Sequence, residues 1–295
     1  MGNPAAGNGR EPRRLAKAVA RLRERKADFE VCVTTAPGHA TELARDFLAA
    51  EPDGVLVAVG GDGTVHEIVQ AMGSAPGKGA LCFVPAGGGN DAARTIGSPR
   101  APEAAVDLAL EGAEKVLDLG LFGREFFFNG VGVGLDGATA AKSKEFRRLR
   151  GLPAYLAAAL ATIARYENPV LKLEGDSGCW EGRALLCAVG NGPSCGGGFL
   201  LTPDASPSDG DLDACMLGDF GRLEALANLP KALSGAHRNH PKASFFRGAS
   251  FALDSDRPLF AHADGEIRRP EFPMKFTVVP GAIRVRAPGF PRARA

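Results

Sequence analysis

The first 120 positions alternate between two patterns of apolar residues. Residues 55–59 (Val-Leu-Val-Ala-Val) and 80–84 (Ala-Leu-Cys-Phe-Val) are continuous apolar runs, typical of strands buried on both faces of a parallel sheet. Residues 29–35 alternate in polarity and predict another strand. Apolar residues recur at helical spacing within 15–22, 40–50 and 65–72. This alternation predicts an α/β domain, a parallel sheet covered by helices, with ligands at the carboxyl ends of its strands.

Beyond residue 120 the pattern changes to short apolar strands separated by glycine and proline. Residues 126–129, 171–173, 183–189 and 212–217 are such strands, and they predict an all-β second domain. One apolar helix is expected over residues 152–166, too short to span a bilayer. We therefore expect an α/β domain over 1–120 and a β domain over 121–280, with residues 281–295 packing back on the first domain.

Composition narrows the class of protein. The chain has 295 residues, 45% of them hydrophobic, which is enough for two domains with their own cores. A net charge of +1 gives no general attraction for nucleic acid, so no nucleic-acid partner is expected. The six cysteines form no Cys-x-x-Cys pair and indicate reduced thiols in a cytoplasmic protein. The N-terminus lacks an apolar core, and no signal peptide is predicted.

The first strand run ends in a turn suited to phosphate. Gly60, Gly61 and Gly63 lack a Cβ and let an anion approach the backbone N–H groups of the helix that follows, for which Thr64 is the expected N-cap. Asp62 lies in the middle of this anion site, so a cation such as Mg²⁺ is implied. The alternative is an ordinary tight turn in which Asp62 bonds the local backbone.

The second strand run also ends in glycines, in the sequence Pro85-Ala-Gly-Gly-Gly-Asn-Asp91. Both turns follow parallel strands, so both are expected at the same edge of the sheet. Two glycine-rich turns that each carry an acid, Asp62 and Asp91, are difficult to explain as coincidental turns. They predict one ligand site shared by the two loops.

These turns belong to a longer series that resembles the diacylglycerol kinase catalytic family, which includes sphingosine and ceramide kinases. The series covers nearly the whole chain in the family's order: Asn3-Pro4, Gly60-Gly-Asp-Gly-Thr64, Gly87-x-x-Asn90-Asp91-x-x-Arg94, Asn129-Gly-x-Gly-x-x-x-Asp136, Gly196-Gly-Gly198, Pro203-x-Ala-x-x-x-Asp209-Gly210 and Asp264-Gly-Glu266. The one departure is Gly88, where the family usually has a threonine hydroxyl.

The resemblance implies an N-terminal nucleotide-binding domain, a C-terminal β-sandwich that takes the lipid, and a substrate cleft lined by Asn129 and Asp136. It implies ATP- and Mg²⁺-dependent transfer of the γ-phosphate to a lipid hydroxyl, with diacylglycerol giving phosphatidic acid as the first choice. The nucleotide-binding residues it implies are Asn3, Thr35, Gly60, Gly61, Asp62, Gly63, Thr64, Glu67, Gly87, Gly88, Asn90 and Asp91.

Residues 203–213 form an acidic loop, and the resemblance implies a structural Mg²⁺ there. Its ligands would be the Asp209 carboxylate and the backbone carbonyls of Ser206 and Asp211, linked through water to Asp62 and Asp91. Carboxylate and carbonyl oxygens suit a hard cation. A solvated acidic loop is the alternative.

Asp264-Gly265-Glu266 is the candidate catalytic motif. Transfer to an alcohol is helped by a base that takes its proton, and we assign Asp264 as that base, with Glu266 orienting it or holding metal. The alternative is a hairpin turn, for which Asp-Gly is a standard pair. His262 has no orienting partner evident in the sequence and is interpreted as structural.

Residues 142–150 are rich in Lys and Arg and precede the apolar helix, which suits either an anionic membrane surface or a solvated helix face. We expect a cytoplasmic enzyme that contacts the membrane transiently. A homodimer is compatible with the sequence. Two other functions stay open: an NAD kinase, which shares the Gly-Gly-Asp-Gly turn, and an inactive nucleotide- or lipid-binding regulator. The acids Asp62, Asp209 and Asp264 are all present, which argues against the regulator.

Overall fold

The computed structural model describes residues 1–4, 11–146, 149 and 151–288. Contacts divide the chain into two units. Unit 1 comprises Met1–Leu119 together with the segment that begins at Pro280, and unit 2 comprises Gly120–Val279.

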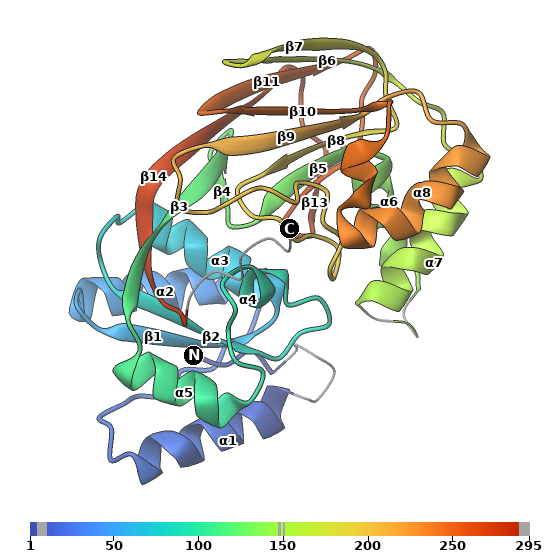
Figure 1. The fold of residues 1–295 in the computed structure, drawn as a ribbon. Coiled ribbons are helices and arrows are strands. Elements are labelled where there is room, and N and C mark those ends of the chain that lie inside the picture. The colour runs from blue at the N-terminus through green and yellow to red at the C-terminus, as the bar shows by residue number, and fades with distance from the viewer. Residues whose placement is uncertain (5–10, 147–148, 150, 289–295) are drawn as a thin grey trace. The chain divides into compact units, whose positions relative to one another are not determined.

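Unit 1 is a small parallel sheet with helices on both faces. Strands β1 and β2 pair in parallel, and the last residues of β14 continue the sheet in parallel with β2. Helices α1 and α5 cover one face, and α2 and α3 cover the other (Figure 1). The elements of this unit are α1 (Glu11–Glu24), α2 (His39–Ala50), β1 (Val55–Gly60), α3 (Asp62–Gly73), β2 (Ala80–Pro85), α4 (Asp91–Thr95), α5 (Pro102–Glu111), the start of β3 (Glu114–Phe122) and the end of β14 (Met274–Arg286).

The core of unit 1 follows from its apolar runs. Most residues of β1 and β2 are buried because helices lie on each side of these strands, as expected for a parallel sheet. Val59 and Val84 pack against Ala105 and Val106 of α5 and against Ala18 of α1. The predicted strands at 55–59 and 80–84 are therefore confirmed.

The strand predicted over residues 29–35 is wrong. This segment is extended chain with one isolated bridge, between Val33 and Gly2, and Gly2 also bridges Val59. The backbone of Gly2 thus takes the hydrogen-bonding position beside β1, donating to Cys32 O (2.9 Å) and accepting from Thr34 N–H (2.9 Å). Because the partner is the start of the chain, no local pattern could show it.

Unit 2 contains two sheets and a helical layer. One sheet has the order β10-β9-β8-β5-β12-β13 and is antiparallel throughout; in the other, β14, β11, β6 and β7 pair in turn, also antiparallel. The elements not yet given are β4 (Glu125–Phe127), β5 (Gly130–Gly134), α6 (Leu135–Ser143), α7 (Leu152–Ile163), β6 (Val170–Gly175), β7 (Gly178–Arg183), β8 (Leu186–Gly190), β9 (Leu212–Leu217), α8 (Arg222–Ser234), the 3-10 helix η2 (Ala236–Asn239), β10 (Ala243–Gly248), β11 (Ser250–Ser255), β12 (Ala261–Ala263) and β13 (Glu266–Arg268).

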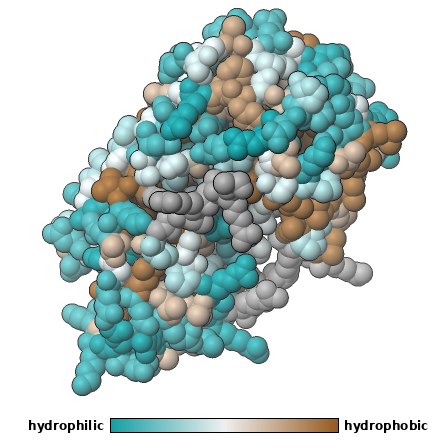
Figure 2. Space-filling model, viewed as in Figure 1, coloured by the Kyte–Doolittle hydropathy of each residue, from teal (hydrophilic) through white to brown (hydrophobic). Residues whose placement is uncertain are grey.

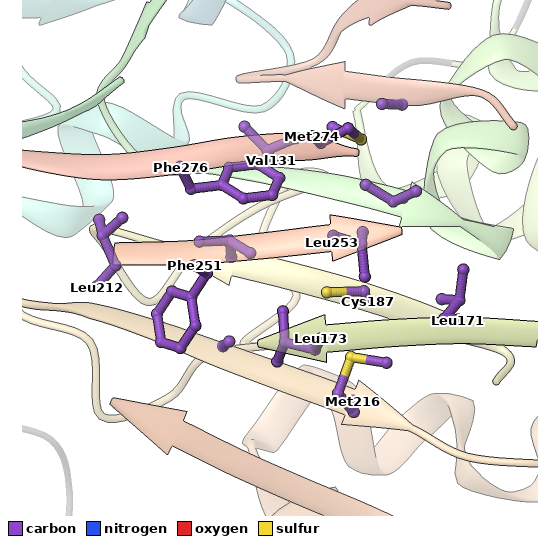
Figure 3. Packing of buried hydrophobic residues seen from close by; sticks show 14 of the residues in the cluster. Val131, Leu171, Leu173, Cys187, Leu212, Met216, Phe251, Leu253, Met274 and Phe276 are labelled. Atoms are coloured by element: carbon purple, nitrogen blue, oxygen red, sulfur yellow. The ribbon is translucent and has the colours of Figure 1, made fainter. Parts of the chain in front are cut away.

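The main core of unit 2 fills the space between the two sheets. Figure 3 shows Leu173, Phe251 and Phe276 of one sheet together with Cys187 and Met216 of the other, and all of them are buried. A second core lies on the opposite side of the β8–β9 pair, where the helices pack. The sequence prediction of an α/β domain followed by a β-sandwich is confirmed in fold class.

The single strand predicted over residues 183–189 is instead two strands in different sheets. The chain leaves β7 at Arg183 and enters β8 at Leu186. Ala184 and Leu185 are both buried where the chain passes between sheets, and their N–H groups bond to Pro169 O and Leu217 O. A continuous apolar run indicates that a segment is buried, but it does not indicate where the chain passes from one sheet to another.

Candidate active site

The Gly-Gly-Asp-Gly turn joins β1 to α3 in unit 1. The N-cap of α3 is Gly61, which, having no side chain, makes no side-chain cap bond to the first turn. The expected cap, Thr64, is wrong: it lies inside α3, and its Oγ1 accepts from the Asn3 amide (3.0 Å). An uncapped helix N-terminus is the local geometry that binds phosphate.

The second glycine loop packs directly against the first. A Cβ on Gly87 would lie 2.5 Å from the Gly61 Cα, and one on Gly61 would lie 2.9 Å from the Gly87 Cα. Asn90 closes this loop in a left-handed conformation (φ 55°), accepting from Gly87 N–H and donating to Gly87 O, both at 2.8 Å. Only glycine permits this close approach of the two backbones. The two loops therefore lie in contact at the ends of β1 and β2, and the prediction that they share one edge of the sheet is confirmed.

The two acids of these loops have different partners. Asp62 Oδ1 accepts from the Ala92 N–H (3.2 Å), which ties the first turn to the start of α4. The buried Asp91 forms an ion pair with Arg94 (2.6 Å). Gly88, where the family hydroxyl is missing, is exposed.

Two other residues implied for nucleotide binding hold the neighbouring loop. The Glu67 carboxylate accepts from Gly38 N–H (2.9 Å) and Ala40 N–H (3.0 Å), so it caps α2. Thr35 contacts the His39 ring through its N–H and its hydroxyl. Glu67 thereby fixes the position of the 35–40 loop, and its role at a nucleotide stays a prediction.

Unit 2 contains an apolar pocket between its helices and the outer face of the β8–β9 pair. It leaves about 590 Å³ that no atom fills, counting the solvent at its mouth. Its walls come mainly from aliphatic and aromatic side chains: Leu135, Asp136, Thr139, Tyr155, Ala159, Ile163, Leu185, Leu186, Phe199, Leu201, Leu217, Phe220, Ala225, Asn228, Leu229, Ala232 and His237. A pocket of this lining suits a hydrocarbon chain.

Asp136 is the carboxylate in the wall of this pocket, and it is part of a buried polar group. Its Oδ2 lies 3.0 Å from His262 Nε2, its Oδ1 accepts from the Tyr155 hydroxyl, and both ionisable side chains are about 3% exposed or less. His262 Nδ1 accepts from Gly265 N–H (3.2 Å), so the proton is on Nε2. His262 therefore has the orienting partners that the sequence did not reveal, since Asp136 lies 126 positions away.

Asp264 is held by the backbone. It and Gly265 are the two turn residues between β12 and β13, both with positive φ (48° and 89°), as in the hairpin alternative. Its carboxylate accepts three N–H groups: Phe128 on Oδ2 (2.7 Å), and Asn129 (2.8 Å) and Gly130 (3.1 Å) on Oδ1. Asp264 thus orders the chain between β4 and β5.

The third residue of this motif, Glu266, pairs with Ala263 across the same hairpin. The catalytic assignments of Asp264 and Glu266 stay predictions.

The acidic loop of unit 2, residues 203–213, forms ion pairs with an arginine of a neighbouring strand. Arg247 on β10 bonds Asp209 Oδ2 (2.5 Å) and Asp211 Oδ2 (3.1 Å), and Asp209 Oδ1 accepts from Asp211 N–H (3.2 Å). Within the described residues, no three His, Cys, Asp or Glu side chains converge in a way that could hold a metal ion. Arg247 thus pairs with the carboxylate that the resemblance assigns to a structural Mg²⁺, and the ion implied at Asp209, Ser206 and Asp211 stays a prediction. That ion enters no step below.

Asp213, at the base of this loop, gives a testable pH dependence. Burial raises its pKa from 3.8 to about 6, against the opposing effect of Arg247, and its Oδ2 has no hydrogen-bond partner among the residues that the structure describes. Between about pH 4 and 6 the folded state therefore binds more protons than the unfolded state, and the free energy of unfolding falls as the pH rises. We expect Asp213→Asn to stabilise the protein by about 1–2 kcal/mol more at pH 7 than at pH 4.

Urea unfolding of the wild type and the variant at both pH values measures this difference. Asp254→Asn, which changes an exposed acid of the same unit, serves as the control. An Asp213→Asn effect that is equal at pH 4 and pH 7 would contradict the assignment.

The comparisons with known proteins agree with the fold of both units. Residues 1–122 match a family model described as the diacylglycerol kinase catalytic domain, and residues 129–287 match one described as the YegS C-terminal NAD kinase beta sandwich-like domain. None of the helices in the described part of the chain has both the length and the apolar character needed to cross a bilayer.

Curated relatives match over most of their length. A Pseudomonas fluorescens protein with the name "Probable lipid kinase YegS-like" is 33% identical over 262 residues, 88% of this chain and 86% of the relative. A Mycobacterium tuberculosis protein named diacylglycerol kinase is 32% identical over 294 residues, 97% of this chain and 93% of the relative. A crystal structure from Bacillus anthracis str. Sterne, of a protein put forward as a diacylglycerol kinase, superposes with a TM-score of 0.81 at 25% identity, covering 97% of this chain and 94% of that one.

Proposed function

The chain belongs to the diacylglycerol kinase catalytic family of lipid kinases, and from that premise we propose that it transfers the γ-phosphate of Mg²⁺-bound ATP to a lipid hydroxyl. Diacylglycerol is the acceptor we propose, and phosphatidic acid is the product.

The apolar pocket of unit 2 is the main observation that supports a lipid as the acceptor. Its walls are lined by side chains such as Leu186, Phe199 and Leu229, with few polar groups among them. NAD, the acceptor of the alternative enzyme, carries charged phosphates, ribose hydroxyls and an amide, and such groups would lose their hydration in this pocket without gaining hydrogen bonds. Acyl chains lose nothing of this kind and gain burial.

The two glycine loops of unit 1 support ATP as the phosphate donor. The uncapped N-terminus of α3 offers backbone N–H groups and a positive dipole to the phosphates of ATP. Asp62, fixed by the Ala92 N–H, would face the metal that accompanies the nucleotide. Mg²⁺ bound to the triphosphate neutralises the charge that develops during phosphoryl transfer.

On the acceptor side, a carboxylate is needed to take the proton of the lipid hydroxyl. Asp264 remains our proposed base, and its three backbone donors hold the carboxylate in one orientation. Asp136 lies in the pocket wall, where the Tyr155 hydroxyl and His262 fix it, so it is placed to bind a polar group at the head of the chain.

A panel of acceptors tests the proposal. The protein would be incubated with labelled ATP, Mg²⁺ and mixed micelles that contain diacylglycerol, sphingosine, ceramide or phosphatidylglycerol, with NAD as a soluble acceptor. We expect the fastest transfer to diacylglycerol and none to NAD. Faster transfer to another lipid would correct the acceptor, while transfer to NAD alone would overturn the proposal.

A further inference from the structure

His262 is a buried histidine on β12 that links the wall of the apolar pocket to the turn that carries Asp264. Its Nε2–H donates to Asp136 Oδ2 (3.0 Å), and its Nδ1 accepts from Gly265 N–H (3.2 Å). Both ring nitrogens are therefore used in hydrogen bonds that fix the orientation of the ring. Asp264 directly precedes Gly265, so the second of these bonds restrains the turn of the proposed base.

Asp136 is held at the other end of this link. It lies in the first turn of α6 and lines the pocket, where the Tyr155 hydroxyl donates to its Oδ1. The side chains of His262 and Asp136 are only 3% and 2% exposed. The surroundings are apolar, since α7 has no charged residue and hydrophobic side chains gather over the region of α7 and α8 at the right of Figure 2. Satisfied polar groups buried in this way form a rigid network.

Gly132 leaves the space in which the Asp136–His262 bond forms. It lies opposite His262 across the β5–β12 pair. A Cβ at this position would lie 1.8 Å from Asp136 Oδ2 and 2.6 Å from His262 Nε2. The backbone of Gly132 is not in the left-handed region, so the requirement for glycine comes from this contact and not from φ.

The Asp264 turn is also fixed to the start of β5. Asp264 N–H donates to Gly130 O (3.0 Å), and its carboxylate accepts the N–H groups of residues 128–130. These bonds set the carboxylate relative to the β-sandwich, whereas the bond from Gly265 to His262 sets the turn relative to the pocket. A single histidine ring thus joins the proposed base to the carboxylate in the pocket wall.

We propose that His262 is a positioning residue for phosphoryl transfer. It holds Asp264 at a fixed distance from Asp136, so that a lipid whose polar head is bound by Asp136 presents its hydroxyl to the base. The proposal rests on the proposed function, in which Asp264 takes the proton of that hydroxyl. A general base must lie within hydrogen-bond reach of the proton that it removes, and a misplacement of about 1 Å can lower the rate by about 10²-fold. A neutral imidazole, with one donor and one acceptor, is sufficient for this role.

Turnover of His262 variants with diacylglycerol in mixed micelles tests this role. His262→Leu removes both hydrogen bonds, and we expect kcat to fall by about 10- to 10²-fold while the KM for ATP stays unchanged. His262→Gln supplies one N–H donor and one oxygen acceptor but cannot take up a proton, so it should recover most of the loss. Gly132→Ala forces Asp136 and His262 apart without changing either side chain, and it should lower kcat by a similar factor.

His240 provides a matched control in the same unit. Its Nδ1 also accepts a backbone N–H, from Lys242 (3.2 Å), and its Nε2 lies 3.6 Å from the Glu224 carboxylate. These contacts join the end of η2 to α8 and do not involve the Asp264 turn. His240→Leu and His240→Gln should therefore leave kcat unchanged. Melting temperatures show which variants are folded at the assay temperature, and kcat is compared among those.

Hydrogen exchange gives a second readout that does not depend on activity. In folded His262→Leu, backbone N–H groups of residues 128–130 and 264–266 should exchange about five- to tenfold faster, the factor that the loss of one hydrogen bond implies. The His240 variants should leave exchange in these segments unchanged.

Several results would overturn the proposal. Folded His262→Leu with wild-type kcat would do so, as would a His262→Gln variant as impaired as His262→Leu, which would assign the ring to proton transfer. If His262→Leu does not fold, Gly132→Ala takes its place, and wild-type kcat there has the same meaning. Wild-type protein that transfers phosphate to no lipid refutes the proposed function even where exchange responds. An active wild type whose kcat and exchange are insensitive to His262→Leu refutes only the role of His262.

Discussion

Replacing Asp62 by asparagine should lower turnover with Mg²⁺-bound ATP by about 10²- to 10³-fold, the loss expected when one electrostatic contact to the transferring group is removed. The substitution keeps an oxygen for the Ala92 N–H, which Asp62 accepts at 3.2 Å, so the link between the glycine loops should survive. What is lost is the negative charge that we propose for the contact with the metal of the nucleotide. Turnover and melting temperature measured together separate the two effects.

Two further variants serve as controls for this prediction. Asp62→Ala also removes the hydrogen bond and should reduce stability by about 1 kcal/mol in addition to the loss of turnover. Asp46→Asn removes an exposed acid of α2 in the same unit and should leave turnover unchanged. Normal turnover in Asp62→Asn would remove Asp62 from the nucleotide site.

The second large effect is expected for Asp264→Asn. If Asp264 takes the proton of the lipid hydroxyl, turnover should fall by about 10²- to 10⁴-fold while ATP affinity stays nearly unchanged, because the amide cannot accept that proton. If Asp264 only closes the hairpin, turnover should stay near normal, since asparagine also adopts positive φ. Steady-state kinetics with diacylglycerol, together with binding of a non-hydrolysable ATP analogue, distinguish the two roles.

The structure adds a consequence for stability. The amide oxygen can still accept from Asn129 and Gly130, but the amide NH₂ would then face the Phe128 N–H, which leaves that donor without its acceptor. We expect a loss of about 1–3 kcal/mol in the free energy of unfolding. Turnover must therefore be measured on folded protein.

Asp176→Asn is the matched control for Asp264→Asn. Asp176 is an acid of the same unit that accepts two backbone N–H groups on one oxygen, an arrangement that asparagine can reproduce. It should retain both stability and turnover. A folded Asp264→Asn variant with unimpaired lipid phosphorylation would return Asp264 to a structural role.

Local patterns predicted those parts of the fold whose causes are local. The apolar runs at 55–59 and 80–84 became β1 and β2, because burial on both faces leaves a direct trace in composition. The contact between the two glycine loops could also be predicted, because the close approach of Gly61 and Gly87 excludes a side chain at either position.

Features set by distant partners left no such trace. Residues 29–35 pair with Gly2 instead of forming a strand, and residues 183–189 divide between two sheets. His262 is oriented by its hydrogen bond to Asp136, and Asp209 is paired with Arg247, which lies 38 positions away in the sequence. In each case the deciding contact joins segments that the sequence separates, so periodicity and motif spacing could not reveal it.

The most direct test of the central claim is the fate of the ATP phosphates. The protein would be incubated with diacylglycerol in mixed micelles and Mg²⁺, once with γ-labelled ATP and once with α-labelled ATP, and the lipid products separated. We expect label in phosphatidic acid from γ-labelled ATP alone, and none when Mg²⁺ is chelated. Folded protein that transfers no label to diacylglycerol, nor to the other lipids of the acceptor panel, would contradict it.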